Sequence, residues 1–172
     1  MMMYMEKLPK LINLEFKEDT RGIFYEFLSD SICNNLDFSR ISQVNFSISK
    51  KGVIRGMHSQ CGIHSQAKII RCVSGSIFDL CIKRENDKPD FNEIHTFNLS
   101  AEQNQALYIP ENFFHGFQAL VENTVVCYGV NRAYDFSSEI TFSPLSPLIK
   151  DLWPLNSAIL SKKDQNSIEI EI

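Results

Sequence analysis

The segment "QVNFSISKKG", residues 43–52, alternates apolar and polar side chains one residue at a time. Its apolar members are Val44, Phe46 and Ile48. Because successive side chains of a strand point to opposite faces of a sheet, this period of two predicts a strand with two different faces, followed by a turn at residues 50–52. The polar face is expected either to meet bulk water or, in a barrel wide enough for a ligand, to line a cavity.

Further β-rich runs follow this strand at close spacing. They read "KIIRCVSGSIFDLCIKRENDKPDF" (68–91), "IHTFNLS" (94–100), "QALYIP" (105–110), "FFHGFQAL" (113–120) and "NTVVCYGV" (123–130). The first run predicts two strands that form a hairpin around Ser74-Gly75-Ser76, with a polar loop after the second strand. Helix signals are confined to residues 27–36 and, near the C-terminus, to residues 156–167, where Asn156 or Ser161 is the expected N-cap.

Many short strands with almost no helical crossover predict an all-β fold. An antiparallel sandwich or barrel satisfies this pattern, and a jelly roll matches a chain of 172 residues that is 44% hydrophobic. We expect one domain over residues 1–172, because the chain is long enough for one well-packed core and too short for two.

The net charge and the cysteine content argue against some classes of binding partner and indicate a cellular compartment. The net charge of −4 gives no positive field for a nucleic-acid backbone or an anionic membrane, so neither partner is expected. Five cysteines without a Cys-x-x-Cys pair are typical of a reducing compartment. Since the sequence also contains no export signal or membrane-spanning stretch, we expect a cytoplasmic protein.

Two of the four histidines stand out. His58 follows an arginine and a glycine in "GVIRGMHSQ" (52–60), and His115 lies between aromatic residues in "IPENFFHGFQAL" (109–120). From their pattern alone, ordinary buried histidines remain an equal alternative. His95 is expected to be a surface or hydrogen-bonded strand residue. The chain contains no His-x-His, which disfavours a metal site and a metal-dependent cupin oxygenase or isomerase.

The order of five motifs resembles the dTDP-4-dehydrorhamnose 3,5-epimerase family. They are "EDTRGIFYE" (18–26), "QVNFSISKKGVIRGMHSQ" (43–60), "HSQAKIIRCVSGSIFDLCI" (64–82), "LYIPENFFHGFQAL" (107–120) and "CYGVNRAY" (127–134). The resemblance extends from about Phe16 to Tyr134. It implies a metal-free cupin, that is, an antiparallel jelly-roll β-barrel with a few short helices, which needs no cofactor and assembles as a homodimer.

The resemblance also implies roles for particular residues. The family's Arg-Gly-x-His motif falls on residues 55–58, so His58 is the expected general base, and Asp164 is the aspartate that orients it. Tyr128 is the expected acid, and Lys68 faces the carbonyl of the sugar. The residues expected to bind a nucleotide-diphosphate sugar are Arg21, Glu26, Gln43, Asn45, Arg55, His115 and Tyr134.

These residue types suit epimerisation next to a carbonyl. Removing a proton from C3 or C5 of a 4-keto sugar gives an enolate whose charge rests on one oxygen. Histidine is a suitable base because imidazole titrates near neutral pH, and an aspartate on its other nitrogen fixes the tautomer. A lysine stabilises the oxyanion. A tyrosine on the opposite face can return the proton, and arginine binds diphosphate through its planar fork.

The sequence departs from the family pattern after Tyr134, in "YDFSSEITFSPLSPLIKDLWP" (134–154). The expected catalytic residues are retained, so we expect the chemistry to be kept while the substrate differs. The hypothesis is a nucleotide 4-keto-6-deoxy hexose or heptose made for a bacterial surface polysaccharide, inverted at C3, C5 or both. The alternatives are a strict dTDP-4-dehydrorhamnose 3,5-epimerase of rhamnose biosynthesis and a non-catalytic cupin that binds nucleotide sugars.

Overall fold

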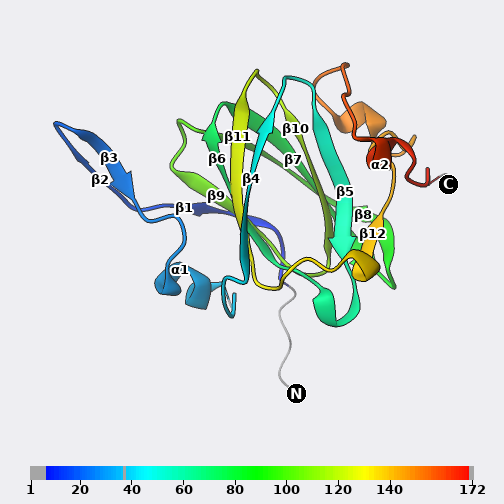
Figure 1. Cartoon of the computed structure of the whole chain (residues 1–172), viewed down its shortest axis with the longest axis horizontal. Coiled ribbons are helices and arrows are strands. Elements are labelled where there is room, and N and C mark those ends of the chain that lie inside the picture. The colour runs from blue at the N-terminus through cyan, green and yellow to red at the C-terminus, as the bar shows by residue number, and fades with distance from the viewer. Residues whose placement is uncertain (1–6, 37, 171–172) are drawn as a thin grey trace.

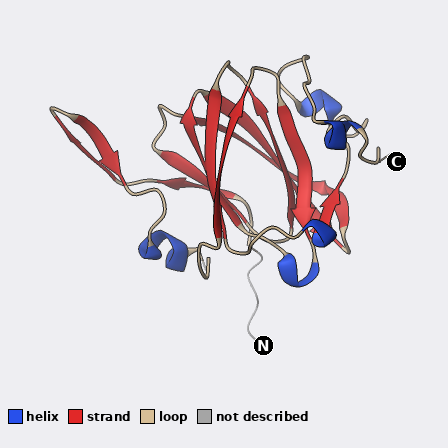
Figure 2. Ribbon diagram, in the orientation of Figure 1, coloured by secondary structure: helices blue, strands red, loops and turns tan. Residues whose placement is uncertain are grey.

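Two five-stranded antiparallel sheets face one another and form a flattened barrel (Figures 1 and 2). The computed structural model describes residues 7–36 and 38–170. In sheet order, the first sheet contains β1 (Lys10–Asn13), β9 (Gln105–Ile109), β6 (Lys68–Ser74), β11 (Thr124–Val130) and β4 (Gln43–Ser49). The second contains β12 (Glu139–Thr141), β5 (Ile54–Gln60), β10 (Phe113–Ala119), β7 (Ser76–Glu85) and β8 (Lys88–Ser100). The predicted cupin jelly roll is confirmed.

The helices are short, as predicted. α1 (Asp30–Asn35) lies in the first predicted helical stretch, and α2 (Lys162–Gln165) lies in the second. Ser161 is the N-cap of α2, because its hydroxyl oxygen accepts a hydrogen bond from the backbone nitrogen of Asp164 at 3.1 Å. Three single 3₁₀ turns occupy Gly62–His64, Phe136–Ser138 and Lys150–Leu152. Within residues 7–36 and 38–170, no helix is long and apolar enough to cross a membrane.

Apolar side chains are buried both between the sheets and behind the second sheet. The cluster between the sheets includes Ile70 and Cys81. The C-terminal part of the chain covers the outer face of the second sheet with Phe142 and Trp153. The indole nitrogen of Trp153 donates a hydrogen bond to the carbonyl oxygen of Pro144 at 2.7 Å, which satisfies its polar group inside this cluster. A third cluster packs residues in and around α1 against the first sheet, so apolar side chains are buried between the sheets and on the outer side of each.

Strand β4 has its apolar face outward. Val44, Phe46 and Ile48 are 46%, 70% and 69% exposed, whereas Gln43, Asn45 and Ser47 line a cavity inside the barrel. The predicted period of two is confirmed, and of the two alternatives for the polar face, bulk water or a cavity, the structure shows the cavity. An apolar face this exposed on an edge strand leaves a surface suited to covering by another chain.

Two local predictions were wrong. Ser74-Gly75-Ser76 does not close a hairpin, because β6 belongs to the first sheet and β7 to the second. Gly75, at φ +81°, makes this corner, where a Cβ would lie 2.6 Å from the Thr124 hydroxyl. The polar run after β7 is not a loop, because β8 begins at Lys88. Only Asn86 and Asp87, both with positive φ, separate β7 and β8, as in a tight hairpin.

A separate hairpin, β2 (Phe16–Asp19) with β3 (Gly22–Tyr25), projects away from the barrel (Figure 1). Its base is tied to the barrel by Arg71, a fully buried side chain of β6. The Arg71 guanidinium donates hydrogen bonds to the Tyr25 hydroxyl and to backbone oxygens of Ser100, Ala101, Gln103 and Gln105. The guanidinium also lies 5.2 Å from the centre of the Tyr25 ring. These partners compensate the burial of its charge.

Candidate active site

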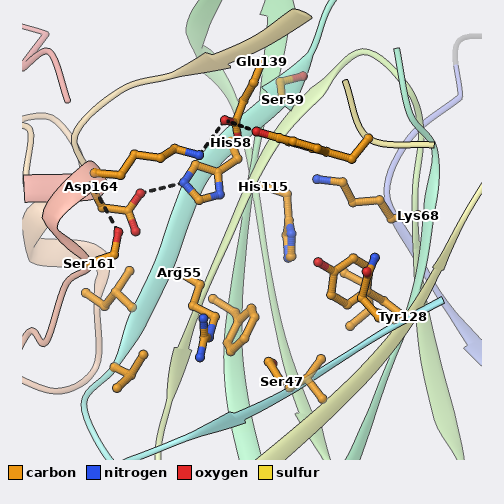
Figure 3. A pocket seen from close by; sticks show the side chains of 18 of the residues that line it. Ser47, Arg55, His58, Ser59, Lys68, His115, Tyr128, Glu139, Ser161 and Asp164 are labelled. Carbon is orange, nitrogen blue, oxygen red and sulfur yellow. Dashed lines mark hydrogen bonds and ion pairs between the residues drawn. The ribbon is translucent and has the colours of Figure 1, made fainter. Parts of the chain in front are cut away.

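A cavity of about 630 Å³ lies between the two sheets and contains the polar residues singled out by the sequence (Figure 3). Among the predicted site residues, its walls include Gln43, Asn45, Arg55, His58, Lys68, His115, Tyr128, Tyr134 and Asp164. A volume of this size is within the range of cavities that bind small organic ligands. The structure thus brings together nine of the eleven predicted residues.

A bulge in β5 explains why an arginine and a histidine three residues apart both line the cavity. Arg55 pairs with Phe117 of β10 and His58 pairs with His115, so three steps on β5 correspond to two on β10. Gly56 lies at the bulge, where a Cβ would be 2.5 Å from the Cα of Gly116. The close approach of the two strands requires glycine there, and it turns both polar side chains to one face.

His58 is hydrogen-bonded to Asp164 of α2. Nε2 of His58 lies 2.6 Å from Oδ1 of Asp164, whose side chain is buried. Burial alone would raise the pKa of the Asp164 carboxyl. The hydrogen bonds from His58 and Ser161 and the charges of His58 and Lys163 outweigh that effect and lower the pKa below its usual value. Asp164 is therefore an ionised acceptor that fixes the His58 ring.

Tyr128 and Lys68 come from the opposite sheet. Tyr128 pairs with Ile70 on β6, and Lys68 lies two residues before Ile70, so both side chains point to the same face. Figure 3 shows them across the cavity from His58 and Asp164. Burial raises the pKa of the Tyr128 phenol, and the charge of Arg55 opposes this only in part. Tyr128 thus keeps its phenol proton on the wall opposite the His58 imidazole.

Burial lowers the pKa of the Lys68 ammonium from 10.5 to about 8, and the nearby Cys81, Glu139 and Asp79 groups offset only part of this effect. Among the described residues, no hydrogen bond or ion pair holds the Lys68 amine. A lysine of this kind can direct its charge toward an oxygen of a bound ligand. Lys68 is therefore suited to stabilise an enolate.

His115 is paired with an acid that the sequence analysis missed. Nε2 of His115 lies 2.5 Å from Oδ1 of Asp79, a fully buried residue of β7. Burial lowers the pKa of His115 and raises the pKa of Asp79, while the hydrogen bond between them opposes both shifts. The signal was present in "SIFDLCIK" (76–83), where one acid interrupts an apolar strand.

Gln43 holds neighbouring protein groups as well as lining the cavity. Its amide nitrogen donates to Oδ1 of Asn45 at 2.7 Å, and its amide oxygen accepts from the backbone nitrogen of Tyr134 at 3.2 Å. Nε of Arg55 donates to the Ser49 hydroxyl at 3.1 Å. These contacts fix the polar wall formed by β4, β5 and the segment after β11. In Figure 3, Arg55 and Ser47 of this wall lie below His58.

Two predicted residues do not reach the cavity of their own chain. Arg21 lies at the tip of the projecting hairpin, 88% exposed and ion-paired with Asp19 at 2.5 Å. Glu26 follows the same hairpin and lines a different hollow beside α1. The cavity of a single chain therefore does not support their predicted role in binding.

Two charged cavity residues, Glu139 and Lys163, were not predicted as site residues. Glu139 accepts hydrogen bonds from the Tyr134 phenol and the Lys163 amine. Their only signal in the sequence was position, since Lys163 precedes Asp164 and Glu139 lies in the segment after Tyr134. His95, expected to be a surface or hydrogen-bonded strand residue, is half-buried on β8, with Nε2 3.5 Å from Oε1 of Glu93 and without a hydrogen bond at that nitrogen within the described part of the chain. In residues 7–36 and 38–170, no three His, Cys, Asp or Glu side chains are arranged to hold a metal ion.

Comparisons with known proteins agree with this geometry. The profile of the family described as dTDP-4-dehydrorhamnose 3,5-epimerase matches residues 8–171. The dTDP-4-dehydrorhamnose 3,5-epimerase of Shigella flexneri is 35% identical over 166 residues, which cover 93% of this chain and 91% of that protein.

Solved structures share the fold. The dTDP-4-dehydrorhamnose 3,5-epimerase of Bacillus anthracis, crystallised with TDP and pyrophosphate, superimposes with a TM-score of 0.86 at 31% identity, covering 94% of both chains. A 4-keto-6-deoxy sugar epimerase from the novobiocin cluster of Streptomyces spheroides gives a TM-score of 0.84 at 29% identity, covering 94% of this chain and 82% of that one. On the sequence profile, the identity and the shared fold, this chain belongs to the dTDP-4-dehydrorhamnose 3,5-epimerase family.

Proposed function

We propose that this protein inverts C3, C5 or both of a nucleotide-diphosphate 4-keto-6-deoxy sugar, without a cofactor. The observation that carries the proposal is the placement of His58, hydrogen-bonded to Asp164, on one sheet and of Tyr128 with Lys68 on the other. A base and an acid on opposite walls of one cavity are what inversion of a carbon centre requires. A protein that only binds a nucleotide sugar has no need of this pair.

The reaction follows from these positions. His58 removes the proton from the carbon next to the carbonyl, and the electron pair of that C–H bond moves to the carbonyl oxygen as an enolate. The Lys68 ammonium stabilises the oxyanion. Tyr128 then delivers a proton to the opposite face of the carbon, the carbonyl re-forms, and proton exchange with water restores His58 and Tyr128. No electron is gained or lost overall.

The nucleotide and diphosphate are proposed to bind along β4 and β5. Arg55 supplies a planar cation, and Gln43 and Asn45 supply amides on the same wall. Tyr134 and His115 line the sugar end of the cavity. We further propose a homodimer in which Arg21 and Glu26 from one chain complete the site of the other. The projecting hairpin, with exposed Phe16, Ile23 and Phe24, and the exposed apolar face of β4 support this arrangement.

The substrate is proposed to be a 4-keto-6-deoxy hexose or heptose for a bacterial surface polysaccharide, such as a capsule or lipopolysaccharide, handled in the cytoplasm. The five cysteines are free thiols, which supports a reducing compartment. The segment after Tyr134 departs from the family pattern and borders the cavity through Tyr134 and Glu139. Exchanging polar contacts at a cavity rim changes specificity without altering the catalytic groups.

The test is solvent deuterium incorporation into 4-keto-6-deoxy sugars, followed by NMR with and without a chelator. Incorporation at C3 or C5 that is insensitive to the chelator is expected. No incorporation with tight binding would favour the non-catalytic cupin. The kcat/KM for dTDP- and GDP-linked hexoses and heptoses, measured on one preparation, then tests the substrate. A clear preference for the dTDP hexose would instead identify a strict dTDP-4-dehydrorhamnose 3,5-epimerase.

A further inference from the structure

Lys163, Glu139 and Tyr134 form a connected polar network at the cavity wall (Figure 3). Oε2 of Glu139 lies 2.5 Å from Nζ of Lys163 and 3.0 Å from the hydroxyl of Tyr134. The Glu139 side chain is only 11% exposed, whereas that of Lys163 is 46% exposed. One carboxylate oxygen therefore links the C-terminal helix to the segment after β11.

Adjacent residues of α2 bind adjacent strands of the second sheet. Lys163 is paired with Glu139 on β12, and Asp164 is paired with His58 on β5. β12 and β5 are themselves hydrogen-bonded neighbours, with Glu139 opposite Gln60. A helix of only four residues cannot hold its own orientation. Backbone hydrogen bonds of Ile159 and Ile168 anchor the chain on either side of α2, and Lys163 adds a side-chain attachment within the helix itself, next to Asp164.

The backbone around Tyr134 is fixed from both sheets. The Gln43 amide oxygen, on β4, accepts from the backbone nitrogen of Tyr134 at 3.2 Å. The Gln60 amide oxygen, on β5, accepts from the backbone nitrogen of Asp135 at 3.0 Å. With its backbone held in this way, the Tyr134 phenol depends on Glu139 for its direction. Burial first, and then the hydrogen bond and charge of Glu139, raise the pKa of Tyr134, so this phenol stays a hydrogen-bond donor.

We propose that Lys163 and Glu139 are a pair of positioning residues that set, from one ion pair, both the orientation of Asp164 against His58 and the direction of the Tyr134 phenol in the cavity. The proposal rests on the epimerase function proposed above. It assigns Lys163 to the catalytic geometry and not to the binding of the diphosphate, although its side chain lines the cavity.

The experiment compares Lys163→Met, Lys163→Arg and Glu139→Gln with Lys162→Met in steady-state epimerisation. Lys162 is the matched control, because it is the preceding lysine of the same helix and no ion pair holds it among the described residues. Small displacements of catalytic groups can cost up to about 100-fold in rate. Lys163→Met and Glu139→Gln should lower kcat by about 10- to 100-fold with KM within about 3-fold of wild type. Lys163→Arg, which keeps the charge, should retain most of the wild-type kcat, and the kcat of Lys162→Met should equal that of wild type.

The double variant Lys163→Met/Glu139→Gln should lose no more than the more damaged single variant, since both changes break one link. A partly exposed ion pair contributes little to stability, so thermal melting of Lys163→Met should stay near that of wild type. If that variant nevertheless unfolds, Glu139→Gln and Lys163→Arg test the same link. Unchanged kcat in Lys163→Met, or a raised KM alone, would overturn the positioning role. Absence of turnover in the wild type would instead refute the proposed function.

Discussion

Nε2 of His58 lies 2.6 Å from Oδ1 of Asp164, although 106 residues separate the two in the chain. Because Asp164 is an ionised acceptor, the proton of this hydrogen bond belongs to Nε2. The unprotonated nitrogen of the ring, Nδ1, is then left to accept a proton from the substrate. The relationship therefore selects the tautomer that a general base requires.

Replacing His58 by Asn should remove epimerisation and solvent exchange together. A positioned acid–base group contributes about 100- to 10,000-fold to rate, so kcat should fall by about that factor. Nucleotide affinity should change little, because Asn keeps a polar group of similar size. NMR of the sugar protons and calorimetry with the nucleotide diphosphate measure the two effects. His95→Asn, at a strand residue outside the cavity, is the control, and turnover in His58→Asn near the control value would exclude His58 as base.

Replacing Tyr128 by Phe should uncouple the exchange of the substrate proton with solvent from the inversion of the carbon centre. His58 can still remove and return a proton on its own face, while the donor on the opposite face is gone. Deuterium should therefore enter the substrate faster than inverted product forms. In the wild type, deuterium incorporation and product formation should proceed at the same rate. The comparison is made by NMR in D₂O on one sample. Inversion at the wild-type rate would show that water or another group is the acid.

The activity should decline as the pH rises through about 8. Burial lowers the pKa of Lys68 to about that value, so its ammonium is charged below this pH and neutral above it. Once the Lys68 amine is neutral, no positive charge from this residue stabilises the enolate. Tyr128 does not explain such a decline, since burial raises the pKa of its phenol above the usual value. In kcat/KM profiles, Lys68→Arg should be slower than wild type but should lose this alkaline decline. A wild-type profile that stays level to pH 10 would contradict the assignment.

In solution the protein should have twice the mass of one chain. Ile48→Glu places a charge on the outward face of β4, where Ile48 is 69% exposed, and should produce monomers with reduced kcat/KM. Ile63→Glu, at an 81% exposed position of the Gly62–His64 turn, should leave the dimer intact. Light scattering at micromolar concentration gives the mass directly. A monomeric wild type with full activity would refute the proposal that Arg21 and Glu26 of one chain complete the site of the other.

Strand positions were predictable where the period of two is local. The residues of β4 carry this signal within seven positions, and even its inward polar face could be anticipated. The hairpin predicted at Ser74-Gly75-Ser76 failed because a turn signal is the same whether the chain returns to its own sheet or crosses to the facing one. Only long-range strand pairing distinguishes these outcomes.

The candidate site was predictable mainly through family resemblance. Periodicity alone marked His58 and His115, but it could not connect His58 with Asp164, which lies on a short helix far along the chain. Asp79 and Glu139 escaped notice because their partners come from other elements, His115 from β10 for Asp79, and the segment after β11 and α2 for Glu139. The bulge at Gly56 likewise has no local pattern, although it decides that Arg55 and His58 share a face.

Residues on the two faces of β4 can be substituted independently of one another during evolution. Its inward residues, Gln43, Asn45 and Ser47, line the cavity, whereas Val44 and Ile48 face away from it and Phe46, although largely exposed, also borders it. Because side chains alternate along a strand, substitutions at the inward positions leave the outward residues Val44 and Ile48 unchanged, and substitutions of these two leave the cavity lining unchanged. A lineage can therefore explore new ligands along this strand without disturbing whatever contact its outer surface makes, and drift in that contact leaves ligand selection intact.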